Sequence, residues 1–314
     1  MKMITATTAA AMLVMGTGQP APAATTARQI AYVRSGDIYV SSGAKETRLT
    51  TGGNHSRPRW SPDGKRIAYL TGTQLWTMNA DGTGPKRLTT RAAGGPAWSP
   101  DGKWIAFASL SCTGGPGVYR VPAAKPATPE VLLPRDCRGE ELPPEPATTA
   151  ARAGSLTDRL RTDDAVAWSP DGKKIAFRGG DCESIYDSCL SVGTVATGGE
   201  TTVAAYGGGS LETQGFAVVP CWRSDGARLS WTAYQQGETT ADNQPVHVVE
   251  LDPATGAKRT VGAAQDRELA YLDATHGVVT GQYRGGSWIT LVGLTDGKRQ
   301  PFHSGSQPSV RPTR

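Results

Sequence analysis

The sequence predicts an all-β protein, a six-bladed β-propeller whose C-terminal strand joins the first blade. Three observations support this prediction. A segment centred on Trp-Ser-Pro-Asp-Gly recurs along the chain, short runs of aromatic and β-branched residues flank each copy, and the C-terminal residues match a strand that the first blade lacks. Repeats of about 40 residues that supply four short strands each are typical of propeller blades.

Three near-identical copies define the repeat. They start at Pro58, Pro96 and Val166 and share Trp-Ser-Pro-Asp-Gly-Lys-x-Ile-Ala followed by an aromatic residue. A degenerate copy spans residues 221–231, and a weaker one spans residues 271–280. Pro presets φ, Asp bonds back to the backbone and Gly accepts a positive φ, so each copy predicts a turn between two strands.

A second hairpin follows in each unit. After the first clear copy, residues 75–79 are predicted as a strand, 81–84 as a turn and 86–89 as the next strand. Each unit therefore offers the four strands of one blade. The 38 residues from Trp60 to Trp98 are a normal blade period.

Longer intervals indicate loops on the same scaffold. Trp98 and Trp168 lie 70 residues apart, and an insertion at about residues 134–164, rich in Pro, Glu and Arg, supplies the excess. Trp168 and Trp222 lie 54 residues apart, with the excess in a cysteine-bracketed loop and a Gly-rich segment. We expect no second domain, so residues 24–314 form one propeller.

The two ends of the chain complete one blade. Residues 28–32 resemble the Lys-Arg-Ile-Ala-Tyr segment that follows the first Trp-Ser-Pro-Asp-Gly, but no Trp-bearing strand precedes them. Residues 306–312 align without a gap to residues 56–62, which places Val310 where Trp60 stands. The C-terminal strand is therefore predicted as the first strand of the first blade, which leaves no open edge in the ring.

The N-terminus has the layout of a secretory signal peptide. Lys2 precedes an apolar stretch at residues 4–15, and small residues with an Ala-x-Ala pattern end at residue 23. Residues 1–23 are therefore predicted to be cleaved. The apolar stretch is shorter than the roughly 20 residues that span a bilayer. We expect a soluble monomer that is secreted, periplasmic or in the cell envelope and does not span the membrane.

Composition restricts the partners. Hydrophobic residues make up 38% of the chain, which is enough for a core. The net charge is +5, but Lys and Arg are scattered singly rather than clustered. Because nucleic-acid binding requires basic residues gathered on one face, we expect no nucleic-acid partner.

The five cysteines suit an oxidising compartment. Cys182 and Cys189 bracket a short polar loop. Cys112 and Cys137 flank another irregular stretch. Both pairs are candidate disulfides, because their spacings do not match zinc sites, although the sequence does not fix the connectivity. Cys221, inside an apolar strand, is predicted to be a buried free thiol.

The repeat resembles that of a known family. The Trp-Ser-Pro-Asp-Gly-Lys-x-Ile-Ala-Phe/Tyr segments at Trp60, Trp98 and Trp168 are similar to the WD40-like (PD40) propeller repeat of the TolB type. Residues 78–84, Met-Asn-Ala-Asp-Gly-Thr-Gly, match the second hairpin of that repeat. The resemblance covers residues 28–314.

The resemblance implies a fold more firmly than a function. TolB is a periplasmic protein that binds the peptidoglycan-associated lipoprotein at its propeller. We expect no counterpart of the N-terminal α/β domain of TolB, because few residues separate the predicted signal peptide from the first strand. Similar repeats also occur in prolyl-oligopeptidase-like peptidases and oligogalacturonate lyases.

The repeated Trp and Asp residues have structural explanations. The Trp side chains could stack on sugars or bases, but packing between blades is the simpler interpretation. The Asp residues could form a carboxylate array, but turn formation explains them as well. These residues are Trp60, Trp98, Trp168, Trp222, Asp63, Asp101, Asp171 and Asp225.

No enzyme motif is found in the sequence. The Gly-x-Ser-x-Gly elbow of serine hydrolases does not occur, and the four histidines lack the paired spacing of metal ligands. The acidic residues at 181, 183 and 187 could hold Ca²⁺, but a solvated loop is the preferred interpretation. We therefore predict no catalytic residue, no cofactor and no metal.

The candidate binding residues lie just before the first strand of each blade. Such residues lie near the channel mouth in propellers of this type, and mixed polar groups around a channel suit ligand or peptide binding. They could also be ordinary polar loop residues. The candidates are Asn54, His55, Asp163, Asp164, Arg267 and Glu268.

Two functions are open. The first is an exported, non-catalytic propeller that binds a protein, a peptide or a cell-envelope component. The second is a propeller enzyme, such as a lyase or a glycan- or peptide-active hydrolase. His or carboxylate side chains that converge on one channel site would favour the enzyme. A channel plugged by apolar side chains would favour a purely structural role.

Overall fold

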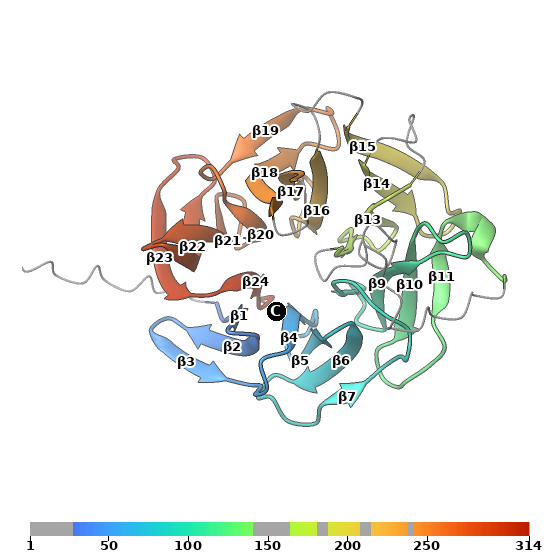
Figure 1. Cartoon of the computed structure of the whole chain (residues 1–314), viewed down its shortest axis with the longest axis horizontal. Helices are drawn as coiled ribbons and strands as arrows, with labels where there is room; N and C mark the ends of the chain where they lie inside the picture. Colours follow the sequence, from blue (N-terminus) through green and yellow to red (C-terminus); the bar gives the residue numbers. More distant parts are fainter. Residues whose placement is uncertain (1–27, 141–163, 181–187, 208–214, 238–241, 314) are drawn as a thin grey trace, which may run out of the picture.

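Six four-stranded antiparallel sheets surround one axis (Figure 1). The computed structural model describes residues 28–140, 164–180, 188–207, 215–237 and 242–313. The predicted all-β six-bladed propeller is confirmed. The predicted signal peptide and most of the predicted insertion lie outside the described residues.

Blades are numbered in chain order, and their strands are given from the axis outward. Blade 1 contains β24 (Ser306–Val310), β1 (Ile30–Arg34), β2 (Asp37–Ser42) and β3 (Lys45–Arg48). Blade 2 contains β4 (His55–Trp60), β5 (Arg66–Thr71), β6 (Gln74–Asn79) and β7 (Lys86–Arg87). Blade 3 contains β8 (Ala97–Trp98), β9 (Trp104–Leu110), β10 (Pro116–Pro122) and β11 (Glu130–Leu133), followed by the short 3₁₀ helix η1 (Arg135–Cys137).

The remaining blades follow the same order. Blade 4 contains β12 (Ala167–Trp168), β13 (Lys174–Arg178), β14 (Ser188–Thr194) and β15 (Glu200–Tyr206). Blade 5 contains β16 (Gly215–Trp222), β17 (Leu229–Gln235), β18 (Gln244–Leu251) and β19 (Lys258–Val261). Blade 6 contains β20 (Arg267–Tyr271), β21 (His276–Tyr283), β22 (Gly286–Gly293) and β23 (Arg299–Ser304).

The C-terminal strand closes the ring in blade 1. β24 pairs antiparallel with β1, with Val310 opposite Ile30. In blade 2, Trp60 stands opposite Ile67 in the same way. The predicted alignment of Val310 with Trp60 is therefore confirmed by the strand register.

The core lies between blades rather than within them. Residues 67–70 of β5 are all buried, because the sheet has a neighbouring blade on each face. Leu70 and Leu75 of blade 2, for example, pack in one cluster with Ile105 and Phe107 of blade 3. Burial of each such side chain contributes about 1.5–3 kcal/mol. Every blade thus depends on its neighbours for stability.

The repeated Trp residues pack against the preceding blade, as predicted. Trp60 is 5% exposed and shares a cluster with Ile38 and Val40 of blade 1. Trp98 packs in the same manner on blade 2, and its indole Nε1 donates a hydrogen bond to the carbonyl of Arg59 at 3.0 Å. Trp168 is buried against blade 3, and the half-buried Trp222 packs against the cluster between blades 4 and 5.

The repeated Asp residues hold the turns, as predicted. Asp63 Oδ1 accepts hydrogen bonds from Ser61 Oγ at 2.6 Å and from the backbone N of Lys65 at 3.0 Å. Asp101 and Asp171 make the same two contacts. In the degenerate fourth copy an arginine replaces the serine, and Arg223 Nε donates to Asp225 Oδ1 at 2.9 Å.

The cysteines agree with the predictions in part. Cys112 and Cys137 form a disulfide. Cys189 is also disulfide-bonded, and its predicted partner, Cys182, lies outside the described residues. Cys221 is a free thiol as predicted, but it is half-buried rather than buried, because its strand lines the propeller axis. No helix among the described residues is long and apolar enough to cross a membrane.

Candidate functional site

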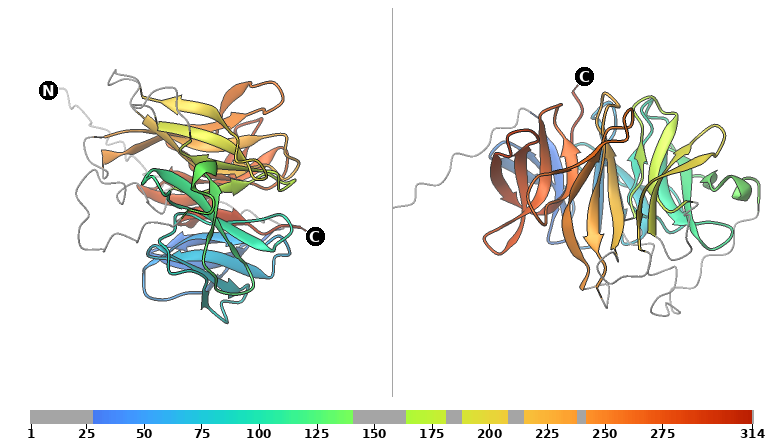
Figure 2. Two further views of the ribbon diagram at one scale, coloured as in Figure 1. Left: turned by 90° about the vertical axis from the view of Figure 1, so that its right-hand side faces the viewer. Right: turned by 90° about the horizontal axis from the view of Figure 1, so that it is seen from above.

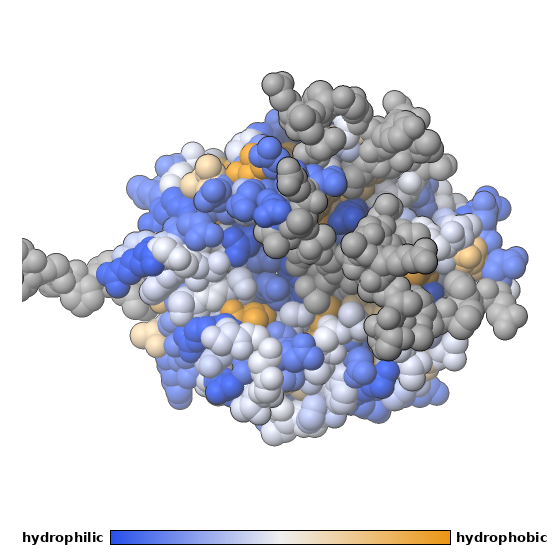
Figure 3. All heavy atoms as spheres, viewed as in Figure 1, coloured by the Kyte–Doolittle hydropathy of each residue, from blue (hydrophilic) through white to orange (hydrophobic). Residues whose placement is uncertain are grey.

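The innermost strands give the propeller two distinct faces. Each innermost strand begins at one face of the ring, which we call the entry face, and ends at the opposite face. We call the opposite face the turn face, because the Trp-Ser-Pro-Asp-Gly turns lie there. The chain leaves β24 at the turn face (Figure 2). The entry face is the one seen in Figure 3, where hydrophilic residues gather around the centre.

Two rings of residues surround the axis at different depths. They follow from the strand register, which aligns Trp60, Trp98, Trp168, Trp222, Tyr271 and Val310. The first ring contains the residues that lie three positions before the aligned residues: Arg57, Gly95, Ala165, Val219, Glu268 and Gln307. The second ring is nearer the turn face and contains the residues that lie one position before the aligned residues: Arg59, Ala97, Ala167, Cys221, Ala270 and Ser309.

Four innermost strands carry a β-bulge at the first ring. The φ angles there are 53° at Arg57, 54° at Val219, 62° at Glu268 and 60° at Gln307, and the register of each strand shifts at the same place. A bulge bends a strand and redirects a side chain. Positive φ is uncommon outside glycine and is unfavourable for a β-branched residue such as Val219. The fold therefore tolerates backbone strain at the axis.

A buried ion pair occupies the first ring. Arg57 Nη1 lies 2.7 Å from Glu268 Oε1, and the two side chains are 1% and 6% exposed. Glu268 Oε2 accepts hydrogen bonds from Thr280 Oγ1 at 2.6 Å and from the backbone N of Gln307 at 2.8 Å. The Gln307 side chain accepts a bond from the backbone N of Arg57 at 2.7 Å. The network ties blades 1, 2 and 6 together across the axis.

The axis therefore has a polar closure. The first ring brings one carboxylate, Glu268, to the axis, and its partner is a guanidinium rather than a second acidic group or a histidine. Among the described residues, no three His, Cys, Asp or Glu side chains lie together as a metal site would require. Nor is the first ring lined by apolar side chains alone, because it contains Arg57, Glu268 and Gln307 beside Gly95, Ala165 and Val219.

The other predicted candidates lie nearer the entry face. Asn54 is exposed. The His55 imidazole is 14% exposed, and its Nδ1 lies 3.1 Å from Oδ1 of the buried Asp37. Arg48 and the backbone N of Gly53 also bind this carboxylate, which places His55 in a fixed position between blades 1 and 2.

Asp164 and Arg267 are likewise held by neighbours. Asp164 is 8% exposed, and its Oδ1 lies 3.0 Å from Arg178 Nη1. The half-buried Arg267 donates a hydrogen bond from Nη2 to Ser287 Oγ at 2.8 Å. Asp163 lies outside the described residues.

The entry face also carries aromatic residues that were not singled out in the sequence. The β21–β22 turn lies at this face, since β20 runs away from it and β21 returns. The rings of Tyr283 and Trp288 meet edge to face there with centroids 5.1 Å apart, and Tyr283 is 38% exposed. The Arg284 guanidinium lies 5.2 Å above the Tyr283 ring. Exposed aromatic and arginine side chains are typical of binding surfaces.

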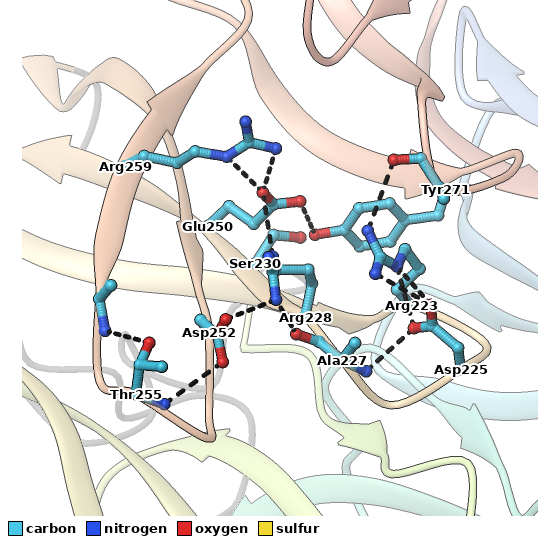
Figure 4. A network of polar contacts seen from close by, with 12 residues as sticks. Arg223, Asp225, Ala227, Arg228, Ser230, Glu250, Asp252, Thr255, Arg259 and Tyr271 are labelled. Atoms are coloured by element: carbon cyan, nitrogen blue, oxygen red, sulfur yellow. Dashed lines mark hydrogen bonds and ion pairs between the residues drawn. The ribbon is translucent and has the colours of Figure 1, made fainter.

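Another buried carboxylate, that of Glu250, lies between blades 5 and 6 (Figure 4). Glu250 lies 2.5 Å from Arg259 Nη2 and accepts a hydrogen bond from the Tyr271 hydroxyl at 3.0 Å. Burial raises the pKa of Tyr271, so the phenol keeps its proton and donates at neutral pH. Each charged group has a partner, so we assign this network a structural role.

Comparisons with known proteins agree on the fold. The chain shares 16% identity with TolB from Acinetobacter baumannii, over 92% of this chain and 68% of that one, with a TM-score of 0.63. The fold resembles that of TolB. A TolB-type protein from Agrobacterium tumefaciens gives 16% identity over 89% of this chain and 90% of that one, with a TM-score of 0.58.

The same architecture also occurs in an unrelated enzyme. Hydrazine synthase from Kuenenia stuttgartiensis matches 90% of this chain with 46% of its own, at 11% identity and a TM-score of 0.62. No protein-family model matches the sequence, and no curated protein matches it either. At these identities the likeness shows the fold alone, and the function has to be inferred from the residues of the site.

Proposed function

We propose that this chain is an exported, non-catalytic propeller that binds a protein, a peptide or a cell-envelope component at its entry face. The observation that supports this most is that His55 and Arg267 are held in place by neighbouring side chains at the entry face, where Tyr283 is exposed. Side chains locked by second contacts lose little freedom when a ligand binds.

The proposed surface consists of Asn54, His55, Arg267, Tyr283 and Trp288. Asp37 fixes the imidazole, and Ser287 fixes the guanidinium. Tyr283, which is 38% exposed, lies on the same face. The buried Arg57–Glu268 pair lies at the axis in the first ring, so we expect a ligand to lie on the face rather than to thread through the ring. Large aromatic rings with polar neighbours that are held in place suit peptide and protein partners.

Export is part of the proposal. The disulfide between Cys112 and Cys137 is stable in an oxidising compartment, and residues 1–23 have a signal-peptide pattern. N-terminal sequencing of the protein from the extracytoplasmic fraction should begin at residue 24. Recovery of the uncleaved chain in the cytoplasm would contradict export.

Affinity capture tests the binding surface. The mature chain is immobilised and exposed to an envelope extract of the source organism, alongside an Arg267→Ala/Tyr283→Ala variant. Lys173→Ala, on an exposed residue of the turn face, is the matched control. We expect one partner to be retained by the parent chain and by Lys173→Ala, and to be reduced at least tenfold by the double variant. Equal capture by all three chains, or capture by none, would contradict the proposal.

A further inference from the structure

Arg59 reaches the propeller axis without a carboxylate partner. Its Nη1 donates a hydrogen bond to the carbonyl of Pro58, its chain neighbour, at 2.9 Å. No described residue forms an ion pair with it, whereas Arg57, two residues earlier, is paired with Glu268. The two arginines of β4 thus differ in their counterions: among the described residues, Arg57 has one and Arg59 has none.

Arg59 and Cys221 belong to opposite sides of the second ring, because blades 2 and 5 are diametrically opposite in a ring of six. The Arg59 guanidinium is within electrostatic reach of Cys221 of blade 5 and of Glu268 of blade 6. Its charge therefore acts across the axis.

The second ring leaves room for this one long side chain. The other five blades place small residues there, which are Ala97, Ala167, Cys221, Ala270 and Ser309. Arg59 is thus the one residue of the second ring that carries a positive charge, among three alanines, a cysteine and a serine. None of the five small residues can supply a negative charge at neutral pH except a cysteine thiolate, and burial raises the pKa of Cys221.

Part of the second ring is exposed to solvent. Arg59, Ala97 and Cys221 are half-buried, whereas Ala167, Ala270 and Ser309 are buried. In the first ring, five of the six residues are buried, Arg57 and Glu268 among them. Because the second ring lies nearer the turn face, that face is the shorter route from solvent to Arg59.

The half-buried Arg59 charge is only partly solvated. Partial removal of an ion from water is unfavourable unless a partner offsets the loss. Burial and the neighbouring Arg57 lower the pKa of Arg59 to about 10, against smaller opposite effects of Cys221 and Glu268. The group is still protonated at neutral pH and has no ion-pair partner among the described residues.

We propose that Arg59 is an anion-binding residue, which takes the carboxylate or phosphate of a small ligand that enters the axis from the turn face. A guanidinium presents a planar fork of donors that matches either group. The small residues around it set the width of the ligand. This site lies on the other side of the first ring from the proposed entry-face surface, so either proposal can fail without the other.

Cys221 provides a probe inside the second ring. We measure alkylation of the peptide that contains Cys221 by mass spectrometry, with iodoacetate, which is an anion, and with neutral iodoacetamide. The ratio of the two rates is independent of the thiol pKa, because both reagents attack the same thiolate. We expect Arg59→Gln to lower the iodoacetate-to-iodoacetamide ratio by about fivefold or more, and Arg59→Lys to preserve it.

Competition identifies the anionic group. Inorganic phosphate and acetate are each added at constant ionic strength while iodoacetamide reacts with Cys221. We expect at least one of them to slow alkylation in the parent chain and in the control Lys45→Gln, on the exposed outermost strand of blade 1, and to lose this effect in Arg59→Gln. Protection by acetate alone indicates a carboxylate ligand, and protection by phosphate indicates a phosphorylated one.

Three results would overturn the proposal. One is an alkylation ratio unchanged by Arg59→Gln in a chain that still melts cooperatively. Another is that neither phosphate nor acetate slows the alkylation of Cys221 in the parent chain. The third is a Cys221 that does not react with iodoacetamide in the folded chain, since that would show that the second ring is closed to solvent.

Discussion

Arg57 and Arg59 share a strand, a charge and a position at the axis, and yet their contributions to stability should be opposite. Arg57 neutralises Glu268 in a network whose members are nearly all buried. Arg59 has no such partner among the described residues. Removal of a paired charge and removal of an unpaired charge change the free energy of unfolding by amounts that differ by several kcal/mol.

Substitution of each arginine should show this difference. Arg57→Ala leaves the Glu268 carboxylate buried without its counterion, so we expect the free energy of unfolding to fall by about 3–5 kcal/mol. Arg59→Ala should leave it unchanged or raise it. Urea unfolding followed by tryptophan fluorescence measures both variants. An equal loss for the two would show that Arg59 is also part of the structural network.

The turn aspartates should make the propeller sensitive to acid. Hydrogen bonds from Ser99 and from the backbone of Lys103 lower the pKa of Asp101 below its usual value of 3.8. For Asp273, burial raises the pKa, but hydrogen bonds from Thr275 and His276 outweigh it and bring the value to about 2. A carboxyl group with a lowered folded-state pKa stabilises the fold above its unfolded pKa, and this contribution is lost as pH falls through the folded value.

We therefore expect melting temperatures to fall between about pH 4 and pH 2. Asp101→Asn removes one of these carboxylates without removing the turn. The difference in melting temperature between the parent chain and this variant should be largest above pH 4 and shrink below it. A difference that stays constant from pH 7 to pH 2.5 would show that the Asp101 charge contributes nothing to stability.

Within blade 3, a disulfide joins the residues that follow β9 to the short helix η1. Cys112 lies just beyond β9, and Cys137 lies in η1 beyond the outermost strand β11. The bond closes a loop with a sequence separation of 25 residues. Loop closure of this size restricts the unfolded chain by about 3 kcal/mol.

Removal of the disulfide should therefore lower stability by a comparable amount. We expect the Cys112→Ser/Cys137→Ser double variant to lose about 3 kcal/mol of unfolding free energy. Urea titration without reductant measures the loss, and Cys221→Ser serves as the control with an unaltered disulfide. Identical midpoints for the double variant and the control would contradict this.

The elements and the site differ in how far the sequence predicts them. The Trp-Ser-Pro-Asp-Gly turns are local, since Ser61, Asp63 and Lys65 bond to one another within a few residues. Their positions were therefore predictable, and so was the role of Trp60. The axis is different, because it assembles one residue from each of six distant segments, and the bulges that redirect Arg57 and Glu268 leave no mark in the repeat.

One signal for the axis was nevertheless present in the sequence. Alignment of the copies at the Trp position places Arg59 in a column otherwise composed of alanine, cysteine and serine. An outlier in a column of small residues indicates a position freed from packing. Glu268 was a candidate only because it lies near the start of the first strand of a blade. The structure shows that it has a buried ion-pair partner, Arg57, which no sequence pattern indicated.

At the scale of the whole molecule, stability depends on closure of the ring by β24. Ile30 and Tyr32 of β1 are fully buried beside this strand. Without it they would lie on an open sheet edge, which favours association between chains. The innermost strand also carries Gln307, which bonds to both Arg57 and Glu268.

Deletion of residues 306–314 should therefore abolish cooperative unfolding and cause aggregation. A synthetic peptide of these residues, added in trans, should restore the melting transition, whereas a scrambled peptide should not. Circular dichroism and light scattering follow the two effects. A truncated chain that melts at the same temperature as the parent would show that blade 1 is stable with three strands.

Blade 1, which combines β24 with β1, β2 and β3, also affects the order in which the blades can fold. Contacts such as Arg28 to Thr313 join residues 285 positions apart, and contacts of such sequence separation form slowly. A ribosome, or a translocation pore passing the chain N-terminus first, delivers β24 after the other strands of the six blades. Blades 2 to 6 can assemble while the chain emerges, but blade 1 must wait for β24. A chain terminated before Ser306 therefore cannot close its ring.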